Sequence, residues 1–133
     1  MERPSGAAAL PQPGGGDPTL SVRIEDAADG ASIVAIGGEL DLSTIPRMQA
    51  PLLEQIGQRP AVLVDLRGLT FIDSSGIGIL IHALRGSNGT PVHILVATDS
   101  QVDRVFRIAG VSEALPVFTG RERALTWTRN GEG

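Results

Sequence analysis

The chain has 133 residues, 41% of them hydrophobic, and a formal charge of −4, which fits a single folded domain with a packed core. It contains no cysteine, and all its basic residues are arginine, so disulfides, thiolate metal sites and lysine Schiff-base chemistry are excluded. An acidic chain with three phenylalanines and one tryptophan also lacks the basic surface and stacking side chains that nucleic-acid binding requires.

The two ends of the chain differ in composition from its middle. Residues 1–18 are rich in Pro, Gly and Ala, and residues 129–133 form a short polar segment. We therefore predict a disordered leader and a flexible tail. The N-terminus has no signal-peptide pattern, and the longest strongly apolar run, residues 76–84, is too short to cross a membrane. We therefore expect a cytoplasmic protein whose single domain covers residues 19–128.

The domain is predicted to begin with a β-hairpin. Residues 20–25 alternate between apolar and polar side chains, which is typical of a half-exposed strand. The turn signal Asp29-Gly30 follows, and the apolar run 32–36 predicts the second strand. That strand closes in the sequence Gly37-Gly38-Glu39-Leu40-Asp41.

A first helix is predicted after this hairpin. Ser43 or Thr44 is a suitable N-cap, and apolar residues recur at helical spacing until a glycine near position 57. Pro51 lies inside this stretch, where a proline removes a helical hydrogen bond. We therefore expect a kink or a later start of the helix at that point.

The rest of the domain alternates between strands and helices. Residues 61–66 are apolar on both faces apart from Asp65, which predicts a central strand, followed by a loop to residue 72. Further strands are predicted over 92–97 and 116–118, and further helices over 74–85 and 121–128. Between these strands another helix is predicted to begin after an N-cap at Ser100, with Ala109 facing inward. This order predicts an α/β fold with a mixed, largely parallel sheet of four or five strands packed against about four α-helices.

One segment combines features that the fold alone does not require. In Asp73-Ser74-Ser75-Gly76-Ile77-Gly78, Ser74 stands where the helix N-cap is expected, and two glycines occupy the first turns. Each glycine costs a helix about 1 kcal/mol relative to alanine, so something is expected to approach the backbone closely. Two interpretations are open: Ser74 is a structural cap, or it displays a hydroxyl at a helix N-terminus that favours a phosphate.

A serine hydrolase is a weaker interpretation of the same residues. The glycine that opens a nucleophile elbow is missing before Ser74. His82 lies eight residues further along the predicted helix, roughly 12 Å away at 1.5 Å per residue, and His93 lies in the next strand. No spacing of histidines and carboxylates predicts a metal site, no phosphate loop is present, and we expect no cofactor.

At these residues the sequence resembles a known family. The Asp73–Gly78 segment, the preceding Asp65-Leu66-Arg67-Gly68-Leu69-Thr70-Phe71-Ile72 and the upstream Gly38-Glu39-Leu40-Asp41 are similar to the STAS domain, specifically to bacterial anti-sigma factor antagonists. The resemblance covers about residues 19–128, and the order of the predicted elements agrees with a STAS fold.

The resemblance implies a protein that switches partners and is not an enzyme. Its unphosphorylated form binds an anti-sigma factor that is also a serine kinase, which frees a sigma factor. The kinase then phosphorylates Ser74, and a metal-dependent serine phosphatase resets the cycle. Asp41 is implied to lie near Ser74, and the expected partner surface comprises Asp41, Asp73, Ser75, Gly76, Gly78 and, on an exposed helix face, Arg104 and Arg107. We expect a monomer when the protein is free.

Other functions stay open within and outside this family. The chain is alternatively a STAS scaffold subunit that is never phosphorylated, such as a stressosome or lipid-transport component. A nucleotide-binding regulator and a small hydrolase that uses Ser74 are further alternatives. Phosphorylation at Ser74 separates the first interpretation from all three.

Overall fold

The computed structural model describes residues 19–87, 89–111 and 117–120. The predicted leader (1–18), last helix (121–128) and tail (129–133) lie outside the described residues. In chain order the elements are β1 (Leu20–Asp26), a 3₁₀ turn (Ala28–Gly30), β2 (Ser32–Leu40), α1 (Ile45–Gln58), β3 (Val62–Ile72), α2 (Ser74–Arg85), β4 (Val92–Leu95), α3 (Gln101–Ile108) and β5 (Val117–Phe118).

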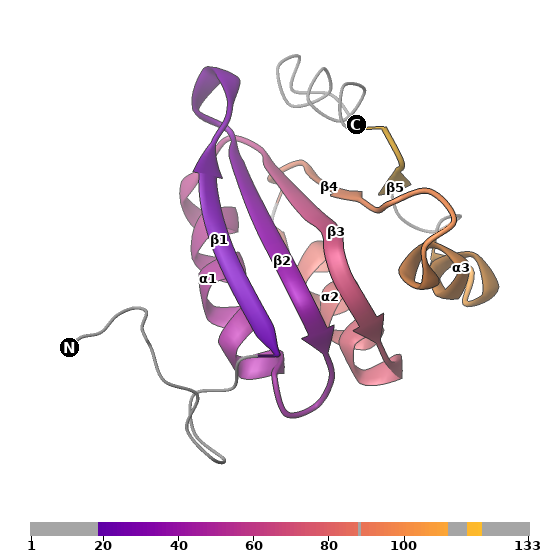
Figure 1. Ribbon diagram of the computed structural model, residues 1–133. Coiled ribbons are helices and arrows are strands. Elements are labelled where there is room, and N and C mark those ends of the chain that lie inside the picture. Colours follow the sequence, from indigo (N-terminus) through magenta and orange to yellow (C-terminus); the bar gives the residue numbers. More distant parts are fainter. Residues whose placement is uncertain (1–18, 88, 112–116, 121–133) are drawn as a thin grey trace.

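The five strands form one mixed sheet in the order β1-β2-β3-β4-β5 (Figure 1). β1 and β2 pair antiparallel, with Asp26 opposite Ser32, whereas β2, β3, β4 and β5 all run parallel. Asp29 and Gly30 both adopt positive φ in the connecting turn, as the Asp-Gly signal predicts. The predicted fold class and the N-terminal hairpin are confirmed, with three helices among the described residues.

The main hydrophobic core lies between the sheet and its helices. Figure 1 shows α1 and α2 on the same face of β1, β2 and β3. Alternate residues of β3 reach this core, among them Val62 and Val64, while Leu63 joins Ile33 and Leu95 in a second buried cluster. Because period-two alternation places these two sets on opposite faces, β3 is buried on both sides, as its apolar run predicts.

Two local predictions are wrong. β3 continues as a strand to Ile72, so no loop follows residue 66. Ala109 is exposed at the end of α3 and does not face inward. The first helix begins at Ile45 and contains Pro51, which excludes the later start that was one of the two alternatives at the proline.

Ser100 caps α3 as predicted. Its hydroxyl oxygen accepts a hydrogen bond from the Asp103 N–H at 3.1 Å, and the Asp103 carboxylate accepts one from the Asp99 N–H at 2.8 Å. These bonds satisfy two backbone donors around the first turn of the helix. The cap therefore fixes the loop between β4 and α3.

The buried histidine of β4 makes the stability of the fold depend on pH. His93 is 2% exposed and stacks on Phe118 with ring centroids 5.0 Å apart. Burial lowers the pKa of His93 from 6.5 to about 4, so the unfolded chain takes up a proton at a higher pH than the folded one. The stability that this neutral ring supports is present above pH 6.5 and is lost as the pH falls towards 4.

We expect this linkage to reduce the free energy of unfolding by about 2 kcal/mol between pH 7 and pH 5. Urea denaturation of the wild type and of His93→Phe at both pH values measures it, since the phenylalanine cannot take up a proton. His82→Gln is the matched control, because His82 is exposed on α2. An equal loss of stability between pH 7 and pH 5 in the wild type and in His93→Phe would show that His93 does not cause this pH dependence.

Candidate functional site

The segment Asp73–Gly78 follows β3 and lies where the two neighbouring strands β2 and β3 end. β2 and β3 run parallel, with Leu40 paired to Ile72, so the loops that follow them emerge at the same edge of the sheet. The Asp73 N–H donates a hydrogen bond to the Leu40 carbonyl at 3.3 Å, which joins the two loops directly. The structure thus brings the Asp41 loop beside the start of α2, as the resemblance implies.

Asp73, rather than Ser74, caps α2. The Asp73 carboxylate accepts hydrogen bonds from the Gly76 N–H at 3.0 Å and from the Ser75 hydroxyl at 2.6 Å. These bonds lower the pKa of Asp73 below its usual value, the Ser75 hydroxyl contributing most, so the cap is ionised at neutral pH. The prediction of a Ser74 cap is wrong because three cap-forming residues stand in a row and only the first meets the Gly76 amide.

This arrangement leaves the two serines in different environments. Ser74 occupies the first helical position and is exposed, and its hydroxyl makes no hydrogen bond to any residue that the structure describes. Ser75 is partly buried, and its hydroxyl is engaged by Asp73. Of the two, Ser74 is therefore the hydroxyl that an enzyme in solution would reach.

The two glycines of α2 have different roles. A Cβ atom on Gly76 would lie 2.9 Å from both the Leu40 carbonyl oxygen and Ile72 Cγ1, so Gly76 allows α2 to pack closely against the end of β2. A Cβ atom on Gly78 would meet no atom of the described residues within 4 Å, and Gly78 is exposed. The fold therefore explains the first glycine and not the second.

Alanine substitutions at these glycines should shift stability in opposite directions. We expect Gly76→Ala to destabilise the protein by about 1–3 kcal/mol through overpacking against backbone. Gly78→Ala should stabilise it by about 1 kcal/mol, because alanine favours a helix interior. Urea denaturation measures both, and shifts of the same sign would contradict this account of the turn.

Asp41 organises the loop between β2 and α1. One carboxylate oxygen, Oδ1, accepts hydrogen bonds from the Ser43 hydroxyl at 2.7 Å, the Ser43 N–H at 3.0 Å and the Thr44 N–H at 3.2 Å. The Thr44 hydroxyl accepts from the Asp41 N–H at 3.0 Å and donates to the Glu39 carbonyl at 2.9 Å. The turn over residues 41–44 is thus held by its own side chains.

The two arginines expected on the partner surface are exposed on α3. The Arg104 guanidinium donates a hydrogen bond to the Asp99 carbonyl. The Nη2 atom of Arg107 lies 3.5 Å from Asp99 Oδ1 and 3.8 Å from Asp103 Oδ2. Among the described residues, no hydrogen bond or ion pair connects them to the turn at Ser74. They stabilise the loop before their own helix while keeping part of each side chain in solvent.

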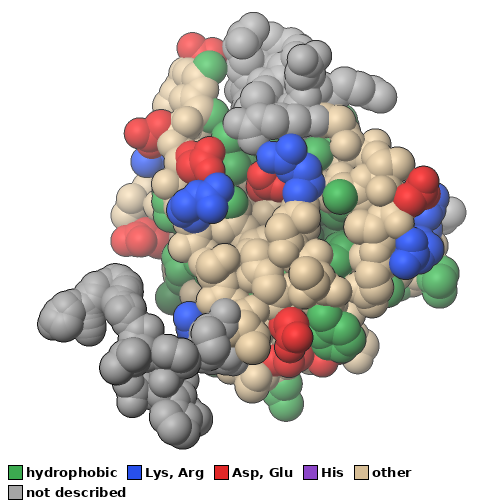
Figure 2. All heavy atoms as spheres, viewed as in Figure 1, with side chains coloured by type: hydrophobic (Ala, Val, Ile, Leu, Met, Phe, Trp, Pro, Cys, Tyr) green, Lys and Arg blue, Asp and Glu red, His purple; other side chains and the backbone are tan. Residues whose placement is uncertain are grey.

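Sequence reasoning missed two exposed hydrophobic side chains at this edge of the sheet. Leu42, in the turn held by Asp41, is 75% exposed, and Phe71, near the end of β3, is 41% exposed. Figure 2 shows hydrophobic and acidic side chains together at the lower end of the sheet, where β2 and β3 end. An apolar residue inside an otherwise polar turn was the available signal for Leu42.

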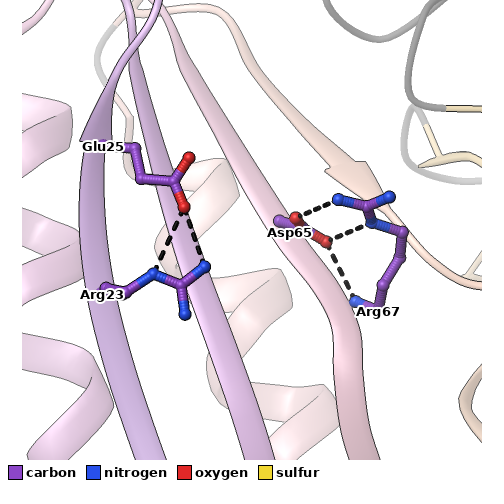
Figure 3. Close-up of polar contacts among 4 residues, drawn as sticks. All are labelled: Arg23, Glu25, Asp65 and Arg67. Carbon is purple, nitrogen blue, oxygen red and sulfur yellow. Dashed lines mark hydrogen bonds and ion pairs between the residues drawn. The ribbon is translucent and has the colours of Figure 1, made fainter.

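A hollow of about 440 Å³ lies elsewhere, on the face of the sheet shown in Figure 3. Arg23 and Glu25 of β1 pair at 2.8 Å, and Arg67 and Asp65 of β3 pair at 2.9 Å. Arg23, Asp65 and Arg67 are the charged residues that line the hollow. Each of the two guanidinium groups is already paired with a carboxylate of its own strand, which weakens its attraction for a bound anion.

Two kinds of site are absent from the part of the chain that the structure describes. Residues 19–87, 89–111 and 117–120 contain no group of three or more His, Asp or Glu side chains placed to hold a metal ion. None of the described helices is both long enough and apolar enough to cross a membrane.

Comparison with known proteins places this geometry in a family. Residues 24–124 match the model of the STAS domain. An anti-sigma-B factor antagonist from Staphylococcus aureus is 32% identical over 93 residues, which cover 67% of this chain and 84% of the relative.

Two solved structures share the fold. An anti-sigma factor antagonist from Mycobacterium paratuberculosis superposes with a TM-score of 0.75 at 24% identity and covers 90% of this chain and 99% of its own. SpoIIAA of Bacillus in its phosphorylated form superposes with a TM-score of 0.61 at 22% identity, covering 82% of this chain and 100% of its own. The chain belongs to the STAS domain family, among the anti-sigma factor antagonists.

Proposed function

We propose that this protein is an anti-sigma factor antagonist controlled by phosphorylation of Ser74. In its unphosphorylated form it binds an anti-sigma factor that is also a serine kinase, and a sigma factor is released. ATP-dependent transfer of a phosphoryl group to the Ser74 oxygen ends the interaction, and a serine phosphatase removes the group again. The protein is a cytoplasmic binding partner, a monomer when free, and performs no catalysis itself.

One observation carries this proposal: the Ser74 hydroxyl is exposed at the start of α2 and has no hydrogen-bond partner among the described residues, whereas the Ser75 hydroxyl is held by Asp73. A kinase needs such a hydroxyl, and a purely structural cap would be engaged with the helix. The family relationship supports the proposal, since relatives are named anti-sigma-B factor antagonists and a structural neighbour is described in a phosphorylated form.

The proposed partner surface is centred on Ser74. It comprises the Asp41 loop, the turn with Asp73, Ser75, Gly76 and Gly78, and the exposed face of α3 with Arg104 and Arg107. Gly76 is buried, so its contribution is to hold α2 against β2. Gly78 leaves open space one turn from Ser74, where the backbone of a partner has room to approach.

Phosphorylation acts mainly at this interface and leaves the fold intact. A phosphate adds about −1.5 to −2 charges and lies at the N-terminal end of a helix, which tolerates anions. The ionised Asp73 already occupies the Gly76 amide, so the helix N-terminus neutralises the new charge only in part. The remaining charge faces a bound partner.

The test is incubation of the purified protein with ATP and each anti-sigma factor of its host. The proposal predicts a mass gain of about 80 Da in the wild type and in Ser75→Ala, and none in Ser74→Ala. Modification that persists in Ser74→Ala would contradict the proposal. Hydrolysis of a chromogenic ester by the wild type, lost in Ser74→Ala, would favour the hydrolase instead.

A further inference from the structure

The turn over residues 41–44 displays a large apolar side chain that the fold does not bury. Leu42 is 75% exposed, while the residues on either side of it, Asp41 and Ser43, are hydrogen-bonded to each other. A turn locked by side-chain hydrogen bonds loses little conformational freedom on binding, which favours a rigid contact. The structure thus pre-organises an apolar group at the surface.

This group lies in the surroundings of Ser74. The turn follows Leu40, whose carbonyl accepts the Asp73 N–H at 3.3 Å, and Phe71 pairs in register with Glu39 on the neighbouring strand. Leu42 and Phe71 therefore emerge at the edge of the sheet where α2 begins, and Phe71 is itself 41% exposed. They make this edge apolar beside the hydroxyl that is proposed to be modified.

Acidic side chains lie at the same edge as the two apolar ones. Glu39 and Asp73 supply negative charge there, and Asp73 is held in its ionised form, whereas the Asp41 carboxylate is engaged within its own turn. A complementary partner has an apolar pocket for Leu42 bordered by basic side chains.

We propose that Leu42 is the apolar anchor of the partner interface and that Asp41 is a positioning residue that acts through it. This inference rests on the proposed function and names the partner surface: an apolar pocket with a basic rim on the anti-sigma factor. Asp41 contributes through its Oδ1 atom, which holds the turn, and its negative charge is not required. A phosphate on Ser74 then disrupts binding because it places a strongly hydrated group beside an apolar contact, and attraction to the basic rim offsets only part of the cost of desolvating it.

The experiment measures the affinity of each variant for the host anti-sigma factor that binds the wild type. Leu42→Ser should weaken binding about 10- to 100-fold, as expected for losing one buried leucine from an interface. Leu53→Ser is the matched control, because Leu53 is 43% exposed on α1, away from this edge; we expect less than a threefold change. Unchanged thermal denaturation of Leu42→Ser excludes a folding defect.

Asp41 is tested by a conservative pair of variants. Asp41→Asn keeps an oxygen that accepts from Ser43 and Thr44, so affinity should stay within about threefold of wild type, whereas Asp41→Ala should lose as much as Leu42→Ser. The double variant Asp41→Ala/Leu42→Ser should bind no more weakly than Leu42→Ser alone, since both changes remove the same contact. An Asn variant as weak as the Ala variant would show that the charge itself makes the contact and would overturn the positioning role.

The outcomes also separate this inference from the function on which it rests. If Leu42→Ser binds with wild-type affinity and Ser74→Asp loses binding, then Leu42 is not the apolar anchor, but control of binding by phosphorylation of Ser74 still holds. A wild-type protein that binds none of the host's anti-sigma factors would overturn both.

Discussion

Placing a negative charge on Ser74 will abolish most of the affinity of this protein for its anti-sigma factor. We expect phosphorylated protein to bind two to three orders of magnitude more weakly, a loss of about 3–4 kcal/mol. Ser74→Asp should show a smaller loss, because a carboxylate carries one charge where the phosphate carries nearly two. Ser74→Ala should bind as tightly as wild type.

The reasons lie in the surroundings of the hydroxyl. Ser74 is exposed, has no hydrogen-bond partner among the described residues, and follows an ionised Asp73 that already caps the helix. A new charge here must therefore be desolvated when a partner covers it, with little compensation from the protein itself. Because the Ser74 side chain is exposed and makes no hydrogen bond to a described residue, the melting temperature should change little.

Isothermal titration calorimetry with the wild type, the two Ser74 variants and the phosphorylated protein measures these affinities. Thr119→Asp is the matched control, since it adds one carboxylate at another exposed hydroxyl residue, after β5. Ser74→Asp with wild-type affinity, or Thr119→Asp with an equal loss, would show that the position of the charge is irrelevant.

The second large effect concerns the end of β2, which carries the Asp41 loop. Gly38 has a φ of +93°, and a Cβ atom there would lie 1.7 Å from the Thr19 carbonyl oxygen. That oxygen accepts the Glu39 N–H at 2.6 Å, so an alanine would separate the start of β1 from the end of β2. We expect Gly38→Ala to destabilise the protein by about 3 kcal/mol or more.

Chemical denaturation of Gly38→Ala and of Gly57→Ala tests this expectation. Gly57 lies in α1, where a Cβ atom would meet no atom in the described part of the chain within 4 Å, so its substitution should leave stability unchanged or raise it by up to about 1 kcal/mol. Partner binding should weaken only in Gly38→Ala, because the displaced strand end carries the loop over 41–44. A Gly38→Ala protein with the wild-type denaturation midpoint would contradict the crowding at this position.

The arrangement of the elements was accessible from sequence because local and long-range patterns agreed. The Asp-Gly turn and the alternation of residues 20–25 sufficed for the hairpin, and helical spacing gave α2 its observed bounds, Ser74–Arg85. The extension of β3 to Ile72 was not accessible, because its second half depends on pairing with β2 across a register shift near Gly37. Such pairing leaves no periodic signal in one strand alone.

The candidate site was only partly predictable for a related reason. The segment Asp73–Gly78 identified the right turn, but not which of its first three residues accepts the Gly76 amide. Asp41 holds its own turn through hydrogen bonds to Ser43 and Thr44, and Leu42 in the same turn is exposed. Both features depend on how residues 41–44 fold together. Side-chain hydrogen bonds of this kind are decided by loop geometry that composition does not encode.

Release of a sigma factor is the most direct test of whether this protein is an anti-sigma factor antagonist that is switched at Ser74. Unphosphorylated protein is titrated into a preformed complex of its host's anti-sigma factor and a fluorescently labelled sigma factor, and free sigma factor is followed by anisotropy. We expect stoichiometric release by the unphosphorylated protein, and none by the Ser74-phosphorylated protein at the same concentration. Equal release by the two forms, or release by neither, would contradict the account.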